Sequence, residues 1–199
     1  MYLYGANGHG KVIREIVESQ GKAVDGFVDD SHDVNELSGL PVKHTMEGVD
    51  EVVVCIDDNK TRKEVAERLG CKFADAVVHS KAIVSPTARI GEGSVVMAGA
   101  IVNPDAQIGR HCIIDMAAFV DYDCVIGDFV HVAPNVSLCG KVQVGEGTLI
   151  GVGASVTPGV KIGKWCTIGA GAAVTEDIPD YSTAVGVPAK VISQKEETI

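Results

Sequence analysis

The stretch Ile90-Gly-Glu-Gly-Ser-Val-Val96-Met-Ala-Gly-Ala-Ile-Val102 contains an aliphatic residue at every sixth position. The same spacing continues without insertion or deletion from Val78 to Val174, which gives seventeen successive hexads. A period of six fits neither an α-helix, with about 3.6 residues per turn, nor a long flat strand, whose side-chain pattern repeats about every two residues. It is typical of a solenoid built from short parallel strands, three to each triangular coil.

A second position in each hexad is also restricted. Four residues after each aliphatic residue lies another small or aliphatic one, such as Ala100, Ala106 or Cys112. We expect the larger side chains to fill the bore and the small ones to fit where the walls converge. Several hexads carry glycine directly after the aliphatic residue, and we expect these glycines to provide the unusual backbone angles and close approach of tight corners. Residues 78–179 are therefore predicted to form a hexapeptide β-helix of about five and two-thirds coils.

The first 77 residues follow a different pattern. A short apolar run precedes a glycine-rich turn at residues 5–11, after which apolar residues continue at helical spacing to Gly21. A second apolar run ends at Asp29-Asp30, and a third, Val52 to Ile56, leads into Asp57-Asp58-Asn59. Strand, glycine turn, helix and a strand ending in an acid predict a Rossmann-like unit, with a second helix capped by one of the residues after Ile56.

Such a unit is suited to bind a nucleotide through its phosphates. Backbone N–H groups at the first helix N-terminus would face the phosphate oxygens, and the acid after the second strand can accept a hydrogen bond from a ribose or a base. The glycine spacing is G-x-x-G-x-G, and the unit is too short for two mononucleotide halves. We therefore expect a mononucleotide or a nucleotide-linked sugar rather than a dinucleotide.

Charge and composition argue against several classes of function. The formal net charge of −10 disfavours nucleic acid and anionic membrane surfaces as partners. The sequence has neither an apolar run of bilayer length nor a secretory signal pattern, so we expect a cytoplasmic protein. Its six cysteines include no CxxC pair and are expected to be thiols. His79, His111 and His131 are too scattered to predict a shared metal site, so no metal is expected.

Five motifs occur in order along the chain: Tyr4-Gly-Ala-Asn-Gly-His-Gly-Lys11, Asp29-Asp30, Asp58-Asn59-Lys-Thr-Arg62, Cys124-Val-Ile-Gly-Asp-Phe-Val-His131 and Gly186-Val-Pro-Ala-Lys190. Together they resemble the nucleotide-sugar acetyltransferases of the sialic acid O-acetyltransferase group, over nearly the whole chain. Within that group the resemblance is to UDP-4-amino-sugar enzymes of the UDP-N-acetylbacillosamine N-acetyltransferase type.

The resemblance implies a left-handed parallel β-helix preceded by a small Rossmann-like α/β domain. It divides the chain into a nucleotide-sugar-binding domain at 1–77, an acyltransferase domain at 78–179 and a C-terminal tail at 180–199. It further implies a homotrimer, with a UDP-sugar held by the N-terminal domain and acetyl-CoA, the co-substrate, lying along the C-terminal coils between subunits.

The family's binding residues can be carried over one by one. The nucleotide-sugar contacts implied in this way are Asn7, Gly8, His9, Asp29, Asp30, Asp57 and Lys60. The implied acetyl-CoA contacts are His131, Gly140, Val152, Gly169 and Ala170.

The chain departs from the family at the catalytic base. The family has a histidine followed by an acid, whereas this chain has Tyr122 followed by Asp123. A tyrosine phenol, with an ordinary pKa of about 10, is a poorer base at neutral pH than a histidine, at about 6.5. Tyr122, Asp123 and, as a second candidate for proton transfer, His131 are the predicted catalytic residues. His131 follows nine residues after Tyr122, and we expect the two side chains to reach a shared cleft.

Three functions remain open from the sequence. The first is transfer of acetyl to the amine of a nucleotide-linked, UDP-type sugar in surface-glycan biosynthesis, favoured because an amine can attack a thioester without a strong base. Four nearby acids, which we expect to form one patch, would attract its ammonium form (Asp115, Asp121, Asp123 and Asp128). The second is a trimeric nucleotide-sugar or CoA-binding protein with weak or lost catalysis. The third is O-acetylation of another small acceptor.

Overall fold

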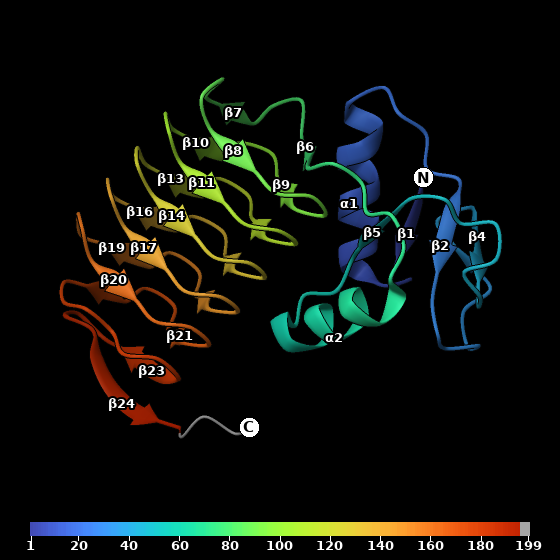
Figure 1. Ribbon diagram of the computed structural model, residues 1–199. Coiled ribbons are helices and arrows are strands. Elements are labelled where there is room, and N and C mark those ends of the chain that lie inside the picture. Colours follow the sequence, from blue (N-terminus) through green and yellow to red (C-terminus); the bar gives the residue numbers. More distant parts are fainter. Residues whose placement is uncertain (196–199) are drawn as a thin grey trace.

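The computed structural model describes residues 1–195, as an α/β unit packed beside a triangular solenoid (Figure 1). The last four residues of the predicted 180–199 tail lie outside the described residues. The described part of that tail forms two further strands, β23 (Ser182–Val185) and β24 (Lys190–Gln194), which pair with each other in antiparallel register. They extend one sheet of the solenoid, so the tail is continuous with it.

The α/β unit contains a five-stranded sheet in the order β3-β4-β2-β1-β5. Strands β1, β2, β4 and β5 are parallel, and the short β3 pairs with β4 in antiparallel register. The predicted strands and helices are confirmed, although β5 ends two residues before the expected Ile56. The elements are β1 (Tyr2–Tyr4), α1 (Gly8–Ser19), β2 (Gly26–Val28), β3 (Glu36–Leu37), β4 (Leu40–Lys43), β5 (Val52–Val54) and α2 (Asn59–Leu69).

Both helices begin at a side-chain cap. Asn7 Oδ1 accepts a hydrogen bond from Gly10 N–H at α1, and Asp58 Oδ1 accepts one from Thr61 N–H at α2. Each cap satisfies a backbone donor that has no partner within the helix. The bonds to Asp58 also hold the pKa of its carboxyl below the usual value, so the cap is charged at neutral pH. Because α1 follows β1 and α2 follows β5, and these two strands are parallel neighbours, the N-termini of both helices lie at the same edge of the sheet.

The solenoid consists of seventeen two-residue strands, β6 to β22, as the hexads predict. Each strand pairs in parallel with the strands eighteen residues away, so residues of successive coils stack in register. The first sheet contains β7 (Ile83–Val84), β10 (Ile101–Val102), β13 (Phe119–Val120), β16 (Ser137–Leu138), β19 (Ser155–Val156) and β22 (Ala173–Val174). The second contains β8 (Arg89–Ile90), β11 (Gln107–Ile108), β14 (Val125–Ile126), β17 (Gln143–Val144) and β20 (Lys161–Ile162). The third contains β6 (Val77–Val78), β9 (Val95–Val96), β12 (Ile113–Ile114), β15 (His131–Val132), β18 (Leu149–Ile150) and β21 (Thr167–Ile168), followed by β23 and β24.

The predicted bore is also confirmed. The second residue of each strand and the small residue before the next strand form one buried cluster that runs the length of the solenoid. Leu138 and Ile150, for example, are fully buried, and Ala118 and Cys124 fill the narrower places between walls. Because apolar burial is the main favourable contribution to folding, this repeated cluster provides most of the stability of the coils.

The corners differ from the prediction in one respect. The left-handed φ belongs to the third residue after the aliphatic one, for example Asp105 (61°), Ala117 (55°) and Phe129 (59°). The glycines directly after the aliphatic residues do not have that conformation. A Cβ on Gly145 would lie 2.5 Å from the backbone nitrogen of Lys164 in the next coil. Close approach between coils, and not an unusual backbone angle, is therefore what requires glycine at those positions.

The α/β unit covers only part of the third sheet. The outward side chains of β6, β9 and β12, among them Val95 and Ile113, share a buried cluster with Ile13 and Ile16 of α1. The later strands β15, β18 and β21 extend beyond this contact. The N-terminus of α2 lies against the next coils, where Asn59 Nδ2 donates to the Gly147 carbonyl oxygen at 3.0 Å. Thus the two parts of the chain are joined along one half of the third sheet and enclose space over the other half.

One buried histidine lies at this junction. His111 is stacked with Phe129 and has an edge contact with Phe73, and its Nδ1 is buried without a hydrogen-bond partner. Burial, with smaller contributions from the nearby Arg110 and Arg62, lowers the pKa of His111 to about 4, while Asp128 opposes this shift. The folded protein therefore binds no proton on this side chain under conditions where the unfolded chain does.

This burial predicts a specific loss of stability in acid. Because the unfolded pKa is about 6.5 and the folded pKa is lower, stability from His111 is complete above pH 6.5 and falls as the pH decreases toward 4. Each pH unit in that range costs about 1.4 kcal/mol, so from pH 7 to pH 5 the loss is about 2 kcal/mol. Urea unfolding at the two pH values should show this loss in wild type and a smaller one in His111→Asn, whereas His79→Asn, at a half-buried corner after β6, should behave as wild type. An equal decrease in the free energy of unfolding between pH 7 and pH 5 in His111→Asn and in wild type would contradict the prediction.

Candidate active site

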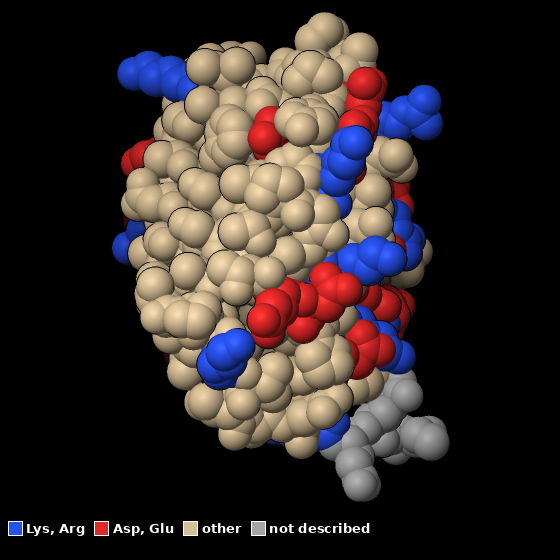
Figure 2. All heavy atoms as spheres, turned by 90° about the vertical axis from the view of Figure 1, so that its left-hand side faces the viewer, with Lys and Arg blue, Asp and Glu red and all other residues tan. Residues whose placement is uncertain are grey.

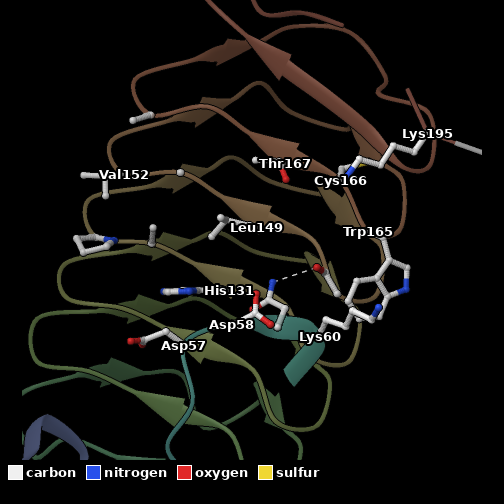
Figure 3. Close-up of a pocket in the computed structure, with 16 residues that line it drawn as sticks. Asp57, Asp58, Lys60, His131, Leu149, Val152, Trp165, Cys166, Thr167 and Lys195 are labelled. Atoms are coloured by element: carbon white, nitrogen blue, oxygen red, sulfur yellow. Dashed lines mark hydrogen bonds between the residues drawn. The ribbon is translucent and has the colours of Figure 1, made fainter. Parts of the chain in front are cut away.

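A pocket of about 780 Å³ lies between the start of α2 and the later strands of the third sheet (Figure 3). Asp57 and His131 lie at one side of it, and Trp165 and Lys195 lie at the other. The α/β unit contributes Asp57, Asp58, Asn59 and Lys60. The solenoid contributes His131, Ala133, Pro134, Gly147, Leu149, Gly151, Val152, Trp165, Cys166, Thr167, Ala170 and Lys195. An apolar wall with charged groups at its margins is a common form of a binding site for a small organic molecule.

His131 projects from the first position of β15 and is paired with an acid from the coil below. Its Nε2 lies 3.3 Å from Asp115 Oδ2, and the two side chains are only 14% and 13% exposed. Burial opposes ionisation of Asp115, but hydrogen bonds from His131 and from the Met116 N–H outweigh it, so the pKa of Asp115 lies below its ordinary value. Asp115 is therefore a carboxylate at neutral pH that can only accept, and the imidazole donates through Nε2.

His9, in the first turn of α1, makes a second histidine–carboxylate pair. Its Nδ1 lies 3.1 Å from Asp57 Oδ1, and its Nε2 is buried without a hydrogen-bond partner. Burial lowers the pKa of His9, and Asp57 only partly offsets this effect. His131 and Asp115 also act electrostatically on His9, so the two pairs belong to one polar cluster. A buried polar atom without a partner marks a place where a ligand or a water molecule would complete the network.

The other predicted nucleotide-sugar residues lie at the carboxyl edge of the α/β sheet, where their side chains already bind protein groups. Besides capping α1, Asn7 donates through Nδ2 to the Cys55 carbonyl oxygen at 3.0 Å. Asp29 accepts from the N–H groups of Ala6 and Ser31 and thereby fixes the glycine turn. Asp30 accepts from Tyr4 and Arg68, and these bonds lower the pKa of its carboxyl. Gly8 is exposed at the start of α1, with open space where a Cβ would lie.

The predicted catalytic Tyr122 lies on a different edge of the solenoid. It is 48% exposed, follows β13 at the corner between the first and second sheets, and is not among the described residues that line the pocket. Its ring packs against Gly140, where a Cβ would come within 2.5 Å of the Tyr122 Cζ atom. The expectation that Tyr122 and His131 share a cleft within one chain is therefore wrong, because nine residues span half a coil and carry the chain past the next corner.

The predicted acidic patch is dispersed for the same reason. Asp115 borders the third sheet, whereas Asp121 accepts a hydrogen bond from Asn103 beside the first sheet. Asp123 occupies the corner after Tyr122, and Asp128 pairs with Arg110 at the next corner. Gly169, one of the predicted acetyl-CoA residues, packs against Val185 of β23 and is not part of the pocket lining. Of the predicted site residues, the structure places Asp57, Lys60, His131, Val152 and Ala170 around one pocket, with His9 beside it.

Several residues of the site were not predicted. Asp115 was expected only as part of an acidic patch, and its pairing with His131 is the most informative omission, because residues eighteen apart stack on successive coils and Ile113 therefore lies beside His131. This spacing was available in the sequence and places Asp115 within reach of His131. Trp165 and Lys195 enter the pocket from a corner and from the end of β24, and no spacing rule indicated them.

Within residues 1–195, no group of three or more metal-binding side chains is assembled, and no helix is long and apolar enough to cross a bilayer.

Two family models match the chain, one for each part. The PglD N-terminal domain matches residues 1–69, and the bacterial transferase hexapeptide model matches residues 87–121 and 141–176. Among curated proteins, UDP-N-acetylbacillosamine N-acetyltransferase of Bacillus subtilis is 42% identical over 107 residues. That match covers 48% of this chain and 50% of the enzyme, so it spans about half the length of the curated relative.

Solved structures match over almost the entire chain. A mutant of perosamine N-acetyltransferase from Caulobacter crescentus, in complex with CoA and GDP-perosamine, is 37% identical with a TM-score of 0.91, covering 97% of this chain and 96% of that one. The chain belongs to the family of nucleotide-sugar N-acetyltransferases. The acetyltransferase domain of PglB from Neisseria gonorrhoeae, in this family, is 36% identical with a TM-score of 0.89, covering 96% and 98% of the two chains.

Membership of the nucleotide-sugar N-acetyltransferase family confirms the predicted architecture and the predicted family. The hexapeptide solenoid and the preceding α/β unit are both present, in the expected order. The roles of individual residues of this chain, including that of Tyr122, stay predictions.

Proposed function

We propose that the protein transfers the acetyl group of acetyl-CoA to the amine of a nucleotide-linked sugar. The observation that carries the proposal is the pocket, where residues predicted to bind the nucleotide-sugar (Asp57 and Lys60) face residues predicted to bind acetyl-CoA (His131, Val152 and Ala170). The similarity over nearly the full chain to an enzyme solved with CoA and GDP-perosamine supports it. Metal chemistry is not needed, because attack of an amine on a thioester requires only positioning and proton transfer.

The chemistry follows from bringing these two parts together. The helix N-termini after β1 and β5 would favour the diphosphate of the nucleotide, and Lys60 adds a positive charge at that edge. The apolar wall formed by Leu149 and Val152 suits the pantetheine arm of CoA. The sugar amine and the thioester would then meet near His131, and holding them there converts a bimolecular reaction into an intramolecular one.

We further propose that the working form is a homotrimer that packs through the first sheet. The outward residues of this sheet are uncharged (Ile83, Ile101, Phe119, Ser137, Ser155 and Ala173). The side of the solenoid at the left of Figure 1 accordingly shows few charges over a broad area in Figure 2. Exposed apolar side chains lie at its margins, including Met116 and Val152, each about half exposed. An uncharged surface bordered by exposed apolar side chains favours contact with another copy.

A trimer packed through the first sheet would bring the predicted acetyl-CoA residues of two subunits together. Gly140 and Tyr122 lie at one edge of the first sheet, and Val152 and Ala170 lie at its other edge. Rotation about a threefold axis places one edge of a subunit against the opposite edge of its neighbour. The two groups, which are separated in one chain, would then face each other across the subunit boundary.

The activity can be tested by following release of the CoA thiol. We expect turnover of acetyl-CoA with GDP-perosamine or with a UDP-linked amino sugar, and a value of kcat/KM at least about tenfold lower for the matching hydroxy-sugar nucleotides, because an amine is the stronger nucleophile. Comparing the two nucleotides identifies the one that the α/β unit accepts. Turnover of hydroxy sugars alone would establish O-acetylation instead, and binding of both ligands without turnover would indicate a binding protein.

A further inference from the structure

The proposed function requires a group that removes a proton from the attacking amine, and the phenol of Tyr122 is poorly suited to this role because a tyrosine ordinarily keeps its proton at neutral pH. Tyr122 stands at the corner between the first and second sheets, with its ring against Gly140. The pocket lies on the third sheet. Among the described residues that line the pocket, His131 is the histidine, and Asp115 is the acid bound to it.

The pairing with Asp115 fixes the state of the His131 ring. An ionised carboxylate can only accept a hydrogen bond, so the contact of 3.3 Å to Asp115 Oδ2 requires that Nε2 carry the hydrogen. The neutral imidazole then has its lone pair on Nδ1. Among residues 1–195, none forms a hydrogen bond with Nδ1, which is therefore available to accept a proton from a ligand. A histidine held in one tautomer by a carboxylate is the usual arrangement of a general base.

The surroundings also suit proton transfer. The titratable and charged groups around the pair are Asp115 at the end of β12, His9 of α1, Asp57 after β5 and Arg62 of α2. His9 remains neutral at pH 7 because burial lowers its pKa, so it adds no positive charge beside His131. The carboxylate of Asp115 stabilises a positive charge that forms on the imidazole during the reaction.

We infer that His131, oriented by Asp115, is the general base of the acetyl transfer and that Tyr122 is not. This assignment rests on the proposed function. The amine nitrogen, present as the neutral form after one proton has left to water, attacks the thioester carbonyl carbon and forms the C–N bond. Nδ1 of His131 takes one N–H proton as the bond forms. The C–S bond breaks with its electron pair on sulfur, and the imidazolium returns the proton to the thiolate. The products are the amide and free CoA, and His131 is neutral again.

The assignment can be tested with steady-state kinetics of the full chain on acetyl-CoA and GDP-perosamine, or on the UDP-linked amino sugar if that is the better acceptor. We expect His131→Asn to lower kcat by about 100-fold or more, within the usual contribution of a general base, and to change KM for acetyl-CoA much less. Tyr122→Phe should lose far less activity than His131→Asn. His79→Asn, a histidine at the corner after β6, serves as the matched control and should retain wild-type kcat.

Asp115→Asn separates a positioning role from simple packing. It keeps the size of the side chain but removes the charge that stabilises the imidazolium. In the pH profile of kcat/KM, the acidic limb, where activity falls as the pH decreases, should therefore move to lower pH by roughly one unit. We also expect kcat to fall about tenfold. A residue that only supports the fold would lower activity without moving the limb, and circular dichroism with thermal unfolding checks that both variants are folded.

Each outcome decides between the proposals. Unchanged kcat in His131→Asn with a raised KM for acetyl-CoA would overturn the assignment and leave His131 as a binding residue. A loss in Tyr122→Phe as large as in His131→Asn, or an unmoved limb in Asp115→Asn, would overturn it as well. In all three cases wild-type turnover would still support the proposed function. Absence of wild-type turnover with any amino-sugar nucleotide would instead overturn the proposed function and the assignment together.

Discussion

Replacing Arg62 with methionine is expected to lower the free energy of unfolding by about 3–5 kcal/mol. The Arg62 side chain is 1% exposed and donates five hydrogen bonds of 2.7–2.9 Å. Its acceptors are the carbonyl oxygens of Ile56, Asp57, His111 and Phe129 and the side-chain oxygen of Asn59. Burial lowers its pKa to about 10, so the guanidinium is still charged at neutral pH, with uncharged oxygens as its partners.

The size of the effect follows from what remains after the substitution. Methionine fills a similar volume but leaves buried acceptors without donors, and each unsatisfied group costs about 1–3 kcal/mol, less where water can enter. Because two acceptors belong to the solenoid and three to the α/β unit, the loss also weakens the joint between them. For a chain of this length, a loss of that size corresponds to a decrease in Tm of roughly 6–20 °C in thermal unfolding.

Arg89→Met is the matched control. Arg89 is exposed at the first position of β8, so its removal should change Tm by no more than about 1–2 °C. Urea unfolding of the two variants and wild type gives the free energies directly. A similar small change in both variants would show that the five hydrogen bonds contribute little to the stability of the joint.

The fold could be predicted because its information is local and repeated. Every hexad has its aliphatic residue at the same position, which marks the side chain that enters the bore. One hexad alone would be a weak signal, but seventeen in succession predict the solenoid reliably. The α/β unit was predicted from glycines, caps and apolar runs, which are also local signals. The reason for glycine after the aliphatic residue was missed in part, because the distance to the next coil depends on a segment eighteen residues away.

The candidate site could be predicted only in part because it depends on which edge of the solenoid a residue occupies. His131 and Tyr122 are neighbours in sequence but lie past different corners, whereas Asp115 and His131 are sixteen residues apart and in contact. The contribution of the α/β unit depends on how it docks, and no sequence pattern determined which coils α2 would face. Asp57 and Lys60 were therefore placed by family resemblance, and Trp165 was not placed at all.

If the protein is the proposed trimer, the separation of Tyr122 and Gly140 from the pocket makes the subunit boundary decisive for activity. If acetyl-CoA binds between the two edges of the first sheet, a monomer holds only half of its contacts. Phe119, near the centre of that sheet at the first position of β13, would then be buried against a neighbouring copy. A charge at this position would be removed from water without a partner in the proposed contact, which costs several kcal/mol per interface.

We therefore expect Phe119→Glu to convert a trimer, at three times the chain mass of 20.8 kDa, into monomers, with a loss of about 100-fold or more in kcat/KM because the acceptor and thioester are no longer held together. Light scattering coupled to size-exclusion chromatography measures the mass, and the CoA-release assay measures the activity. Val125→Glu places the same charge on the second sheet, at a side chain that is 44% exposed, and should leave both unchanged. A monomeric wild type with full turnover would contradict the trimer and return the whole acetyl-CoA site to the pocket of a single chain.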